Sequence, residues 1–184
     1  MSAELVALNP QVHSRLKMRA AAPGEAPFRE IVPSEIISAS TTCPVFFSKS
    51  PQHGNFYLGV MTGFRPGEWL IPGRSEGVPP FRSLDLQRDG FFIDGEGLVI
   101  DPANSRFDDT EGEALFDRQG EPTPALRQIQ QVLGRLQAGQ DEGAAFIAAM
   151  LHHRLIEPID ISLRFDDGEK LVLQGLYTIS LDAL

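Results

Sequence analysis

The sequence predicts an α+β fold, mostly antiparallel β-sheet, in which a helical hairpin is followed by a C-terminal β-hairpin. Short apolar stretches separated by glycine and proline turns fill the N-terminal half, helical periodicity begins at Thr123, and apolar and polar residues alternate over residues 159–165. The chain has 184 residues, of which 42% are apolar, so it is long enough to bury a core. We expect a single domain over residues 1–184.

The N-terminal half predicts a β-hairpin and further short strands. Residues 45–47 and 56–62 are apolar and flank the turn-forming segment 51–54, which is typical of a hairpin. Additional strands are expected at residues 68–71, 81–86, 90–93 and 97–100.

Two helices are expected after Thr123. Thr123 suits an N-cap, Pro124 suits the first helical position, and leucine or isoleucine then recurs every three or four residues. The residues of this apolar stripe are Leu126, Ile129, Leu133 and Leu136. Gly139 is expected to end the first helix and Asp141 to cap a second, which gives an antiparallel helical hairpin.

The C-terminal segment predicts two antiparallel strands. Residues 159–165 alternate between apolar and polar side chains, as a half-buried strand does. Asp167-Gly168 favours a tight turn, and residues 171–179 supply the returning strand.

Charge and hydropathy exclude several classes of partner. The net charge of −9 argues against nucleic acid, because phosphate backbones are bound by concentrated basic surfaces. No apolar run approaches the roughly 20 residues of a membrane-spanning helix. The first residues lack the basic and apolar regions of a signal peptide. We therefore expect no membrane span and, by default, a cytoplasmic location, with signal-less export as an open alternative.

The sequence assigns no catalytic residue and no cofactor. Gly73-Arg74-Ser75-Glu76-Gly77 fits the G-x-S-x-G pattern of a nucleophile elbow, which requires a helix directly after the serine. Pro79 and Pro80 prevent that helix, so we expect Ser75 not to be a nucleophile. Cys43, the single cysteine, lies in apolar company and is expected to be a buried small hydrophobe.

No metal site is expected either. His152 and His153 are adjacent on a predicted helix, where neighbouring side chains point about 100° apart and do not easily share one ion. Residues 94–121 are strongly acidic but lack the spacing of a calcium-binding loop.

Short motifs follow one another along nearly the whole chain. They are Leu8-Asn9-Pro10 with His13, Val32-Pro33-Ser34-Glu35, Cys43-Pro44-Val45-Phe46-Phe47, Gly63 with Gly67-Glu68 and Leu70, Gly112-Glu113-Ala114-Leu115-Phe116-Asp117, Gly120-Glu121-Pro122-Thr123, and Gly175-Leu176-Tyr177-Thr178-Ile179. In this order they resemble the bacterial SapC-like family, named for a surface-layer-associated protein. The resemblance implies a link to the cell envelope and gene neighbours of halogenase and oxygenase type. It implies no catalytic residues.

We therefore expect a non-enzymatic accessory or binding protein, linked to cell-envelope or nutrient-uptake functions, that recognises a protein or peptide partner. One alternative is an enzyme or enzyme subunit with a noncontiguous site, acting with such halogenase or oxygenase neighbours. Its candidate polar groups are His13, Glu35, Glu68 and Asp117. A second alternative is a structural surface-layer component.

The candidate ligand-binding residues are mainly aromatic and lie beside the proline- and glycine-rich segment 72–80. They are Tyr57, Phe64, Glu68 and Trp69, together with His13 from the first motif. Tryptophan and tyrosine are enriched in binding hot spots. The alternative is that these rings fill the core of a short hairpin, in which case Trp69 is shielded from solvent.

Overall fold

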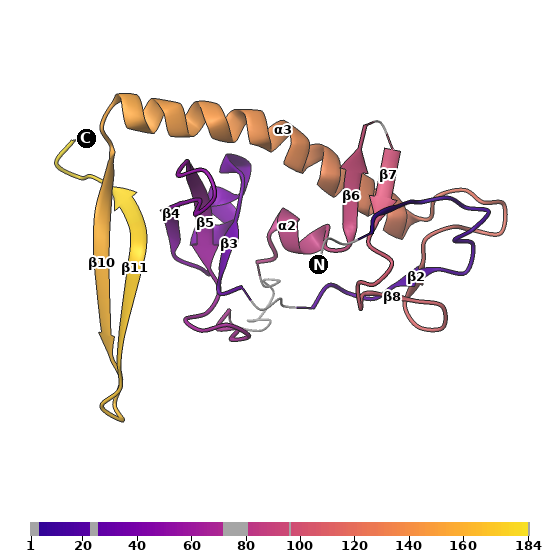
Figure 1. Cartoon of the computed structure of the whole chain (residues 1–184), viewed down its shortest axis with the longest axis horizontal. Helices are drawn as coiled ribbons and strands as arrows, with labels where there is room; N and C mark the ends of the chain where they lie inside the picture. The colour runs from indigo at the N-terminus through magenta and orange to yellow at the C-terminus, as the bar shows by residue number, and fades with distance from the viewer. Residues whose placement is uncertain (1–3, 23–25, 72–80, 96, 184) are drawn as a thin grey trace. The chain divides into compact units, whose positions relative to one another are not determined.

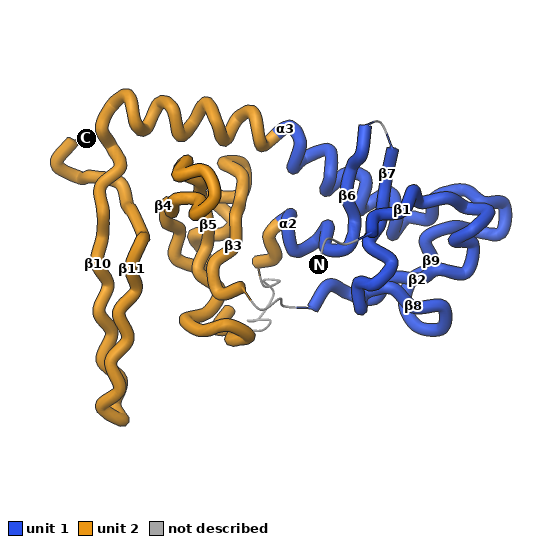
Figure 2. Tube along the Cα trace, in the orientation of Figure 1, with its two compact units in different colours: residues 1–24, 84–138 blue, residues 25–83, 139–184 orange. Residues whose placement is uncertain are grey.

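In the described part of the chain, a computed structural model shows antiparallel strands, two short α-helices and one long α-helix, which confirms the predicted α+β class (Figure 1). The structure describes residues 4–22, 26–71, 81–95 and 97–183. The chain divides into two compact units (Figure 2): unit 1 comprises residues 1–24 and 84–138, and unit 2 comprises residues 25–83 and 139–184. The single domain over residues 1–184 stays a prediction.

Within its described residues, unit 1 contains two small antiparallel sheets. The first has the strand order β1-β7-β6 and the second the order β8-β2-β9. Their strands are β1 (Val6–Ala7), β2 (Lys17–Met18), β6 (Phe91–Asp94), β7 (Gly97–Ile100), β8 (Phe107–Asp108) and β9 (Glu113–Ala114). The strands expected at residues 90–93 and 97–100 are confirmed as the β6–β7 hairpin, in which Phe91 pairs with Ile100.

The core of unit 1 forms around the first part of helix α3 (Pro124–His152). Leu126, Ile129 and Leu133 are buried and pack with Phe91 of β6 and with Leu115. The apolar stripe predicted from the helical spacing is therefore confirmed for these three positions.

A short helix replaces the strand expected at residues 81–86. Helix α2 (Leu84–Gln87) buries Leu84 and Leu86. The carboxylate of Asp85 accepts a hydrogen bond of 3.0 Å from Nε of Arg88, three residues on. This spacing favours a helical turn over an extended strand.

Unit 2 is built on a five-stranded antiparallel sheet of order β10-β11-β4-β5-β3. Its elements are β3 (Phe28–Glu30), the 3₁₀ helix η1 (Pro33–Glu35), α1 (Ile36–Ser40), β4 (Val45–Lys49), β5 (Phe56–Met61), β10 (Ile156–Arg164) and β11 (Lys170–Ile179). Both predicted β-hairpins, β4–β5 and β10–β11, are confirmed. The β10–β11 hairpin joins the sheet through Leu176 and Tyr177 and reaches past the ends of β4 and β5 (Figure 1).

The predicted helical hairpin is wrong, because α3 is one continuous helix of 29 residues. Gly139 lies inside this helix and is not a C-cap. A Cβ atom added at Gly139 would lie 2.6 Å from the Cβ atom of Val32, so the glycine allows the helix to approach the chain just before η1. Tertiary packing at this point explains a glycine that local rules take for a helix end.

The helix ends instead at His152, and Arg154, two residues later, has a left-handed φ of 56°. The N–H of Leu155 donates to the carbonyl of Met150 at 2.9 Å, and the N–H of Arg154 donates to the carbonyl of Leu151 at 3.1 Å. These two bonds form a Schellman motif, which satisfies the last carbonyls of the helix. An arginine, not a glycine, adopts the left-handed conformation here.

Gly139→Ala and Gly134→Ala are expected to change stability in opposite directions. Alanine is favoured over glycine inside a helix by about 1 kcal/mol, and nothing lies within 4 Å of a Cβ atom added at Gly134. Gly134→Ala should therefore raise the free energy of unfolding. Gly139→Ala should lower it by about 1–3 kcal/mol, because the new methyl group clashes with Val32. Urea denaturation of the two variants measures both changes, and a stabilising Gly139→Ala would contradict the close approach.

Leu133→Ala is expected to lower the free energy of unfolding by about 2–5 kcal/mol, because it leaves a cavity in the core of unit 1. Leu133 is 6% exposed, whereas Leu151 on the same helix is 46% exposed. Leu151→Ala is the matched control and should shift the thermal midpoint much less. Equal shifts in the two variants would show that the stripe does not carry the core.

Candidate functional site

A cavity of about 630 Å³ in unit 2 is the best candidate site. It lies between residues 139–151 of α3 and the ends of the strands beneath, at β3 and at the β4–β5 turn. Its described lining comprises Glu30, Ile31, Val32, Pro33, Lys49, Gly54, Asn55, Phe56, Tyr57, Leu58, Gly139, Gln140, Gly143, Ala144, Phe146, Ile147, Ala148 and Leu151. Its volume is within the range of about 300–1,000 Å³ that small-molecule pockets occupy.

Small residues of α3 make room for this cavity. Gly139, Gly143, Ala144 and Ala148 all line it and follow one another at spacings of four, one and four residues. At 1.5 Å per residue, the stretch from Gly139 to Leu151 is about 18 Å long. The helix residues that line the cavity therefore extend over about 18 Å of α3.

Larger side chains of α3 hold the helix above the sheet. Phe146 stacks on Phe47 of β4, with ring centroids 6.2 Å apart and planes inclined by 21°. Phe146, Ile147 and Met150 pack against the buried cluster that includes Leu58. The helix is thus anchored by a few large residues and leaves space where its residues are small.

Lys49 provides the only positive charge among the described residues that line this cavity. Its ammonium group lies 4.7 Å from the ring centroid of Phe56 and 5.2 Å from that of Tyr177. Cations over aromatic faces are attracted by the ring quadrupole. Lys49, Asn55 and Gln140 thus give a largely apolar cavity a few polar groups with which a ligand can be oriented.

A second cavity of about 440 Å³ adjoins the first, and Phe146 and Leu58 line both cavities. Residues of α1, β4, β10, β11 and the segment after β11 complete its wall. Both cavities belong to unit 2.

The structure distributes the predicted ligand-binding residues over three places. Tyr57 lines the larger cavity, and its ring contacts that of Phe28 edge-on at 5.9 Å. Phe64, Glu68 and Trp69 lie in the loop after β5 and line neither cavity. His13 belongs to unit 1.

The loop after β5 supports the C-terminal hairpin. Oε2 of Glu68 accepts hydrogen bonds from the N–H groups of Phe64 (2.7 Å) and Arg65 (3.1 Å), so this segment is a closed turn and the strand expected at 68–71 is wrong. The ring of Phe64 contacts that of Phe165 at 6.2 Å, and Arg65 forms an ion pair with Glu169 at the hairpin tip.

Trp69 is half-buried and packs against the core of unit 2. It is neither a fully shielded core tryptophan nor one standing free in solvent. Its role in binding stays a prediction.

The polar residues considered for a noncontiguous enzyme site each bond to their own segment. The N–H of Asn9 donates to Nδ1 of His13 at 3.1 Å, and the N–H of Val32 donates to Oε2 of Glu35 at 3.1 Å. Oδ1 of Asp117 accepts two backbone hydrogen bonds of 2.9 Å from residues 119 and 121. Together with Glu68, these side chains stabilise turns.

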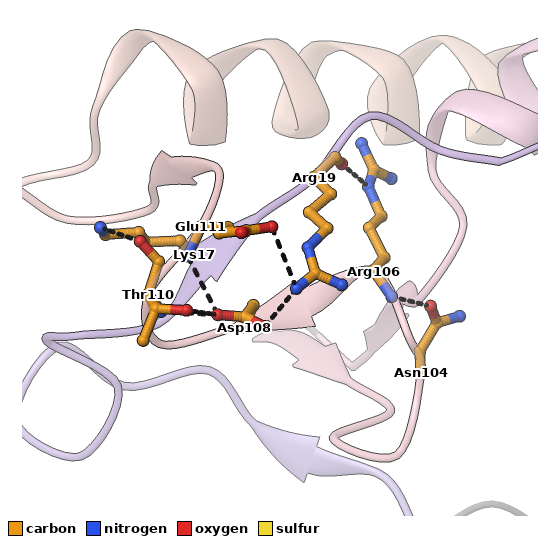
Figure 3. A network of polar contacts seen from close by, with 7 residues as sticks. All are labelled: Lys17, Arg19, Asn104, Arg106, Asp108, Thr110 and Glu111. Atoms are coloured by element: carbon orange, nitrogen blue, oxygen red, sulfur yellow. Dashed lines mark hydrogen bonds and ion pairs between the residues drawn. The ribbon is translucent and has the colours of Figure 1, made fainter.

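A polar network in unit 1 is also structural (Figure 3). Oδ1 of Asp108 accepts hydrogen bonds from the hydroxyl of Thr110 and from the N–H groups of Thr110 (2.6 Å) and Glu111 (3.0 Å). These bonds, and to a smaller extent the ion pair with Arg19, hold the pKa of Asp108 well below its usual value. The carboxylate is therefore charged across the physiological pH range and organises the turn after β8.

Arg106 crosslinks three backbone segments of unit 1. Arg106 is 8% exposed. Its guanidinium donates to the carbonyls of Arg19 (2.9 Å), Gln87 (2.7 Å) and Asp89 (2.9 Å). A buried guanidinium that donates to three backbone carbonyls fixes the fold around it.

The cysteine and the histidines show no arrangement for chemistry. Cys43 is buried as predicted, and burial raises the pKa of its thiol, so it is protonated at neutral pH. His152 and His153 are exposed at the end of α3, with ring centroids 4.9 Å apart. The described part of the chain contains no group of three or more potential metal ligands. The Gly73–Gly77 motif lies outside the described residues.

No helix in the described ranges is both long and apolar enough to cross a membrane. This finding agrees with the expectation from the hydropathy of the sequence.

The family model for SapC matches residues 8–184, nearly the whole chain. The chain belongs to the SapC family. No curated protein and no solved structure matches it.

Sequence reasoning about this SapC family member missed both cavities. The small residues that line the larger one, Gly139, Gly143, Ala144 and Ala148, are visible in the sequence, but their spacing does not place them on one helix face. The predicted helix end at Gly139 also separated that glycine from the other three.

Asp108→Asn is expected to destabilise the protein at pH 7 and to lose this effect in acid. The pKa of Asp108 is lowered by folding, so the charged carboxylate stabilises the fold above the unfolded-state value of about 3.9. That stabilisation is lost as the pH falls below this value. The difference between the thermal midpoints of the two proteins should stay constant from pH 7 to pH 5 and narrow progressively from pH 4 to pH 2, and a difference that does not narrow would show that the charge is not responsible.

Proposed function

We propose that this SapC family member is a non-enzymatic accessory or binding protein that recognises a protein or peptide partner through the larger cavity of unit 2. The cavity beside α3 carries this proposal. Its apolar walls can bury side chains of a partner, and its few polar groups can orient them. A link to cell-envelope or nutrient-uptake functions is part of the proposal and rests on the family.

The length of helix that lines the cavity favours a chain-like ligand. An extended peptide advances about 3.3–3.6 Å per residue, so the roughly 18 Å of helix beside the cavity matches about five residues. Tyr57 and Phe56 in its wall are side chains of the kind that anchor peptides at binding hot spots.

Filling the cavity is expected to abolish partner binding without unfolding the protein. All four alanines are exposed helix positions, but Ala144 and Ala148 line the cavity, whereas Ala145 and Ala149 do not. The leucines of Ala144→Leu/Ala148→Leu therefore enter the cavity lining. Ala145→Leu/Ala149→Leu is therefore a control with the same composition, and leucine is almost as favourable as alanine in a helix.

The two double variants and the wild type are used as baits in the native host, and the captured proteins are quantified by mass spectrometry. The proposal expects a partner that binds the wild type and the control at least tenfold more than the filled variant. Circular dichroism checks that all three are folded. A partner retained equally by the filled variant and the control would place recognition elsewhere.

A further inference from the structure

We propose that the smaller cavity of unit 2 docks a basic, apolar segment of a partner protein. This inference rests on the proposed function, because it requires a protein partner. It adds the chemistry of that partner and a second binding surface on this chain, apart from the larger cavity. The two observations behind it are the apolar side chains at the mouth of the cavity and the sign of the charges beside them.

The cavity has an apolar floor and an exposed apolar mouth. Phe47 and Leu58 at its base are buried, whereas Leu181 and Ile179 at its rim are 80% and 37% exposed. Large apolar side chains that stand in water beside a hollow are typical of an interaction surface. A partner's apolar side chain entering the cavity would bury these groups.

All charged side chains among the described lining residues are acidic. They are Glu157 at the start of β10 and Asp182 after β11, and neither forms an ion pair with any residue that the structure describes. The net charge of −9 adds a long-range attraction for cations. Lysine or arginine next to an apolar anchor is therefore the complementary chemistry.

A second copy of this chain fits the surface less well. A two-fold contact places the same patch of both copies face to face. It would bring Glu157 and Asp182 of each copy toward their equivalents, and such like-charge contacts oppose association.

The test measures binding of a fluorescein-labelled peptide of alternating lysine and leucine by fluorescence anisotropy. The same peptide with glutamate in place of lysine should not bind. Glu157→Gln/Asp182→Asn should weaken binding roughly tenfold, because two rim charges are lost. Asp160→Asn/Asp166→Asn removes the same net charge from exposed positions of the β10–β11 hairpin outside the cavity and should leave the affinity almost unchanged.

A second pair of variants tests the apolar part of the surface. Leu181→Ser should weaken the lysine–leucine peptide several-fold, whereas Val172→Ser should not, although Val172 is also exposed, at 54%. Circular dichroism confirms that all variants are folded.

Four outcomes overturn the inference. Equal weakening by both acidic double variants would show attraction to the overall charge and not to this surface, and failure of the peptide to bind the wild type would remove the proposed chemistry. Binding that is lost in Ala144→Leu/Ala148→Leu but kept in Glu157→Gln/Asp182→Asn would place the peptide in the larger cavity, which leaves the proposed function standing. Self-association that Leu181→Ser abolishes, seen by analytical ultracentrifugation, would identify a second copy as the occupant.

Discussion

Unit 2 depends on the close approach of helix α3 to Val32 at Gly139. The absence of a side chain at Gly139 lets the helix backbone come within reach of Val32, and the helix then continues over the sheet. Phe146 can stack on Phe47 only because the helix runs on without a break. Both cavities are bounded by Phe146, so their positions follow from the same contact.

The two parts of α3 pack in different ways. In unit 1 the helix buries Leu126, Ile129 and Val132 almost completely, as a structural helix does. From residue 140 to residue 152 no residue is fully buried, and small side chains alternate with a few large anchors. Apolar surface that the protein itself leaves uncovered costs stability, so the second part of the helix is where a partner has most to gain by binding.

The sequence predicted elements whose signal is local. The alternation over residues 159–165 corresponds to a strand, and the spacing of Leu126, Ile129 and Leu133 corresponds to the buried face of a helix. An element that packs on one side repeats its apolar residues with its own period, about 2 residues for a strand and about 3.6 for a helix. Gly139 was misread because a glycine that ends a helix and a glycine that admits a neighbouring chain look the same in sequence. The proposed binding role of Phe64 and Trp69 was likewise inferred from neighbouring residues alone, and it stays a prediction. Their contacts with Phe165 and with the core of unit 2 come from residues far away in the chain.

The motifs that carry the family resemblance describe the fold more than a chemistry. In four of them the polar side chain accepts hydrogen bonds from the backbone within four residues: His13, Glu35, Glu68 and Asp117. Groups used in this way fix where turns lie. The side chains that line the cavities, such as Lys49, Glu157 and Asp182, lie mostly outside those motifs. Membership of the family therefore specifies the scaffold, and recognition is expected to depend on residues that the motifs do not contain.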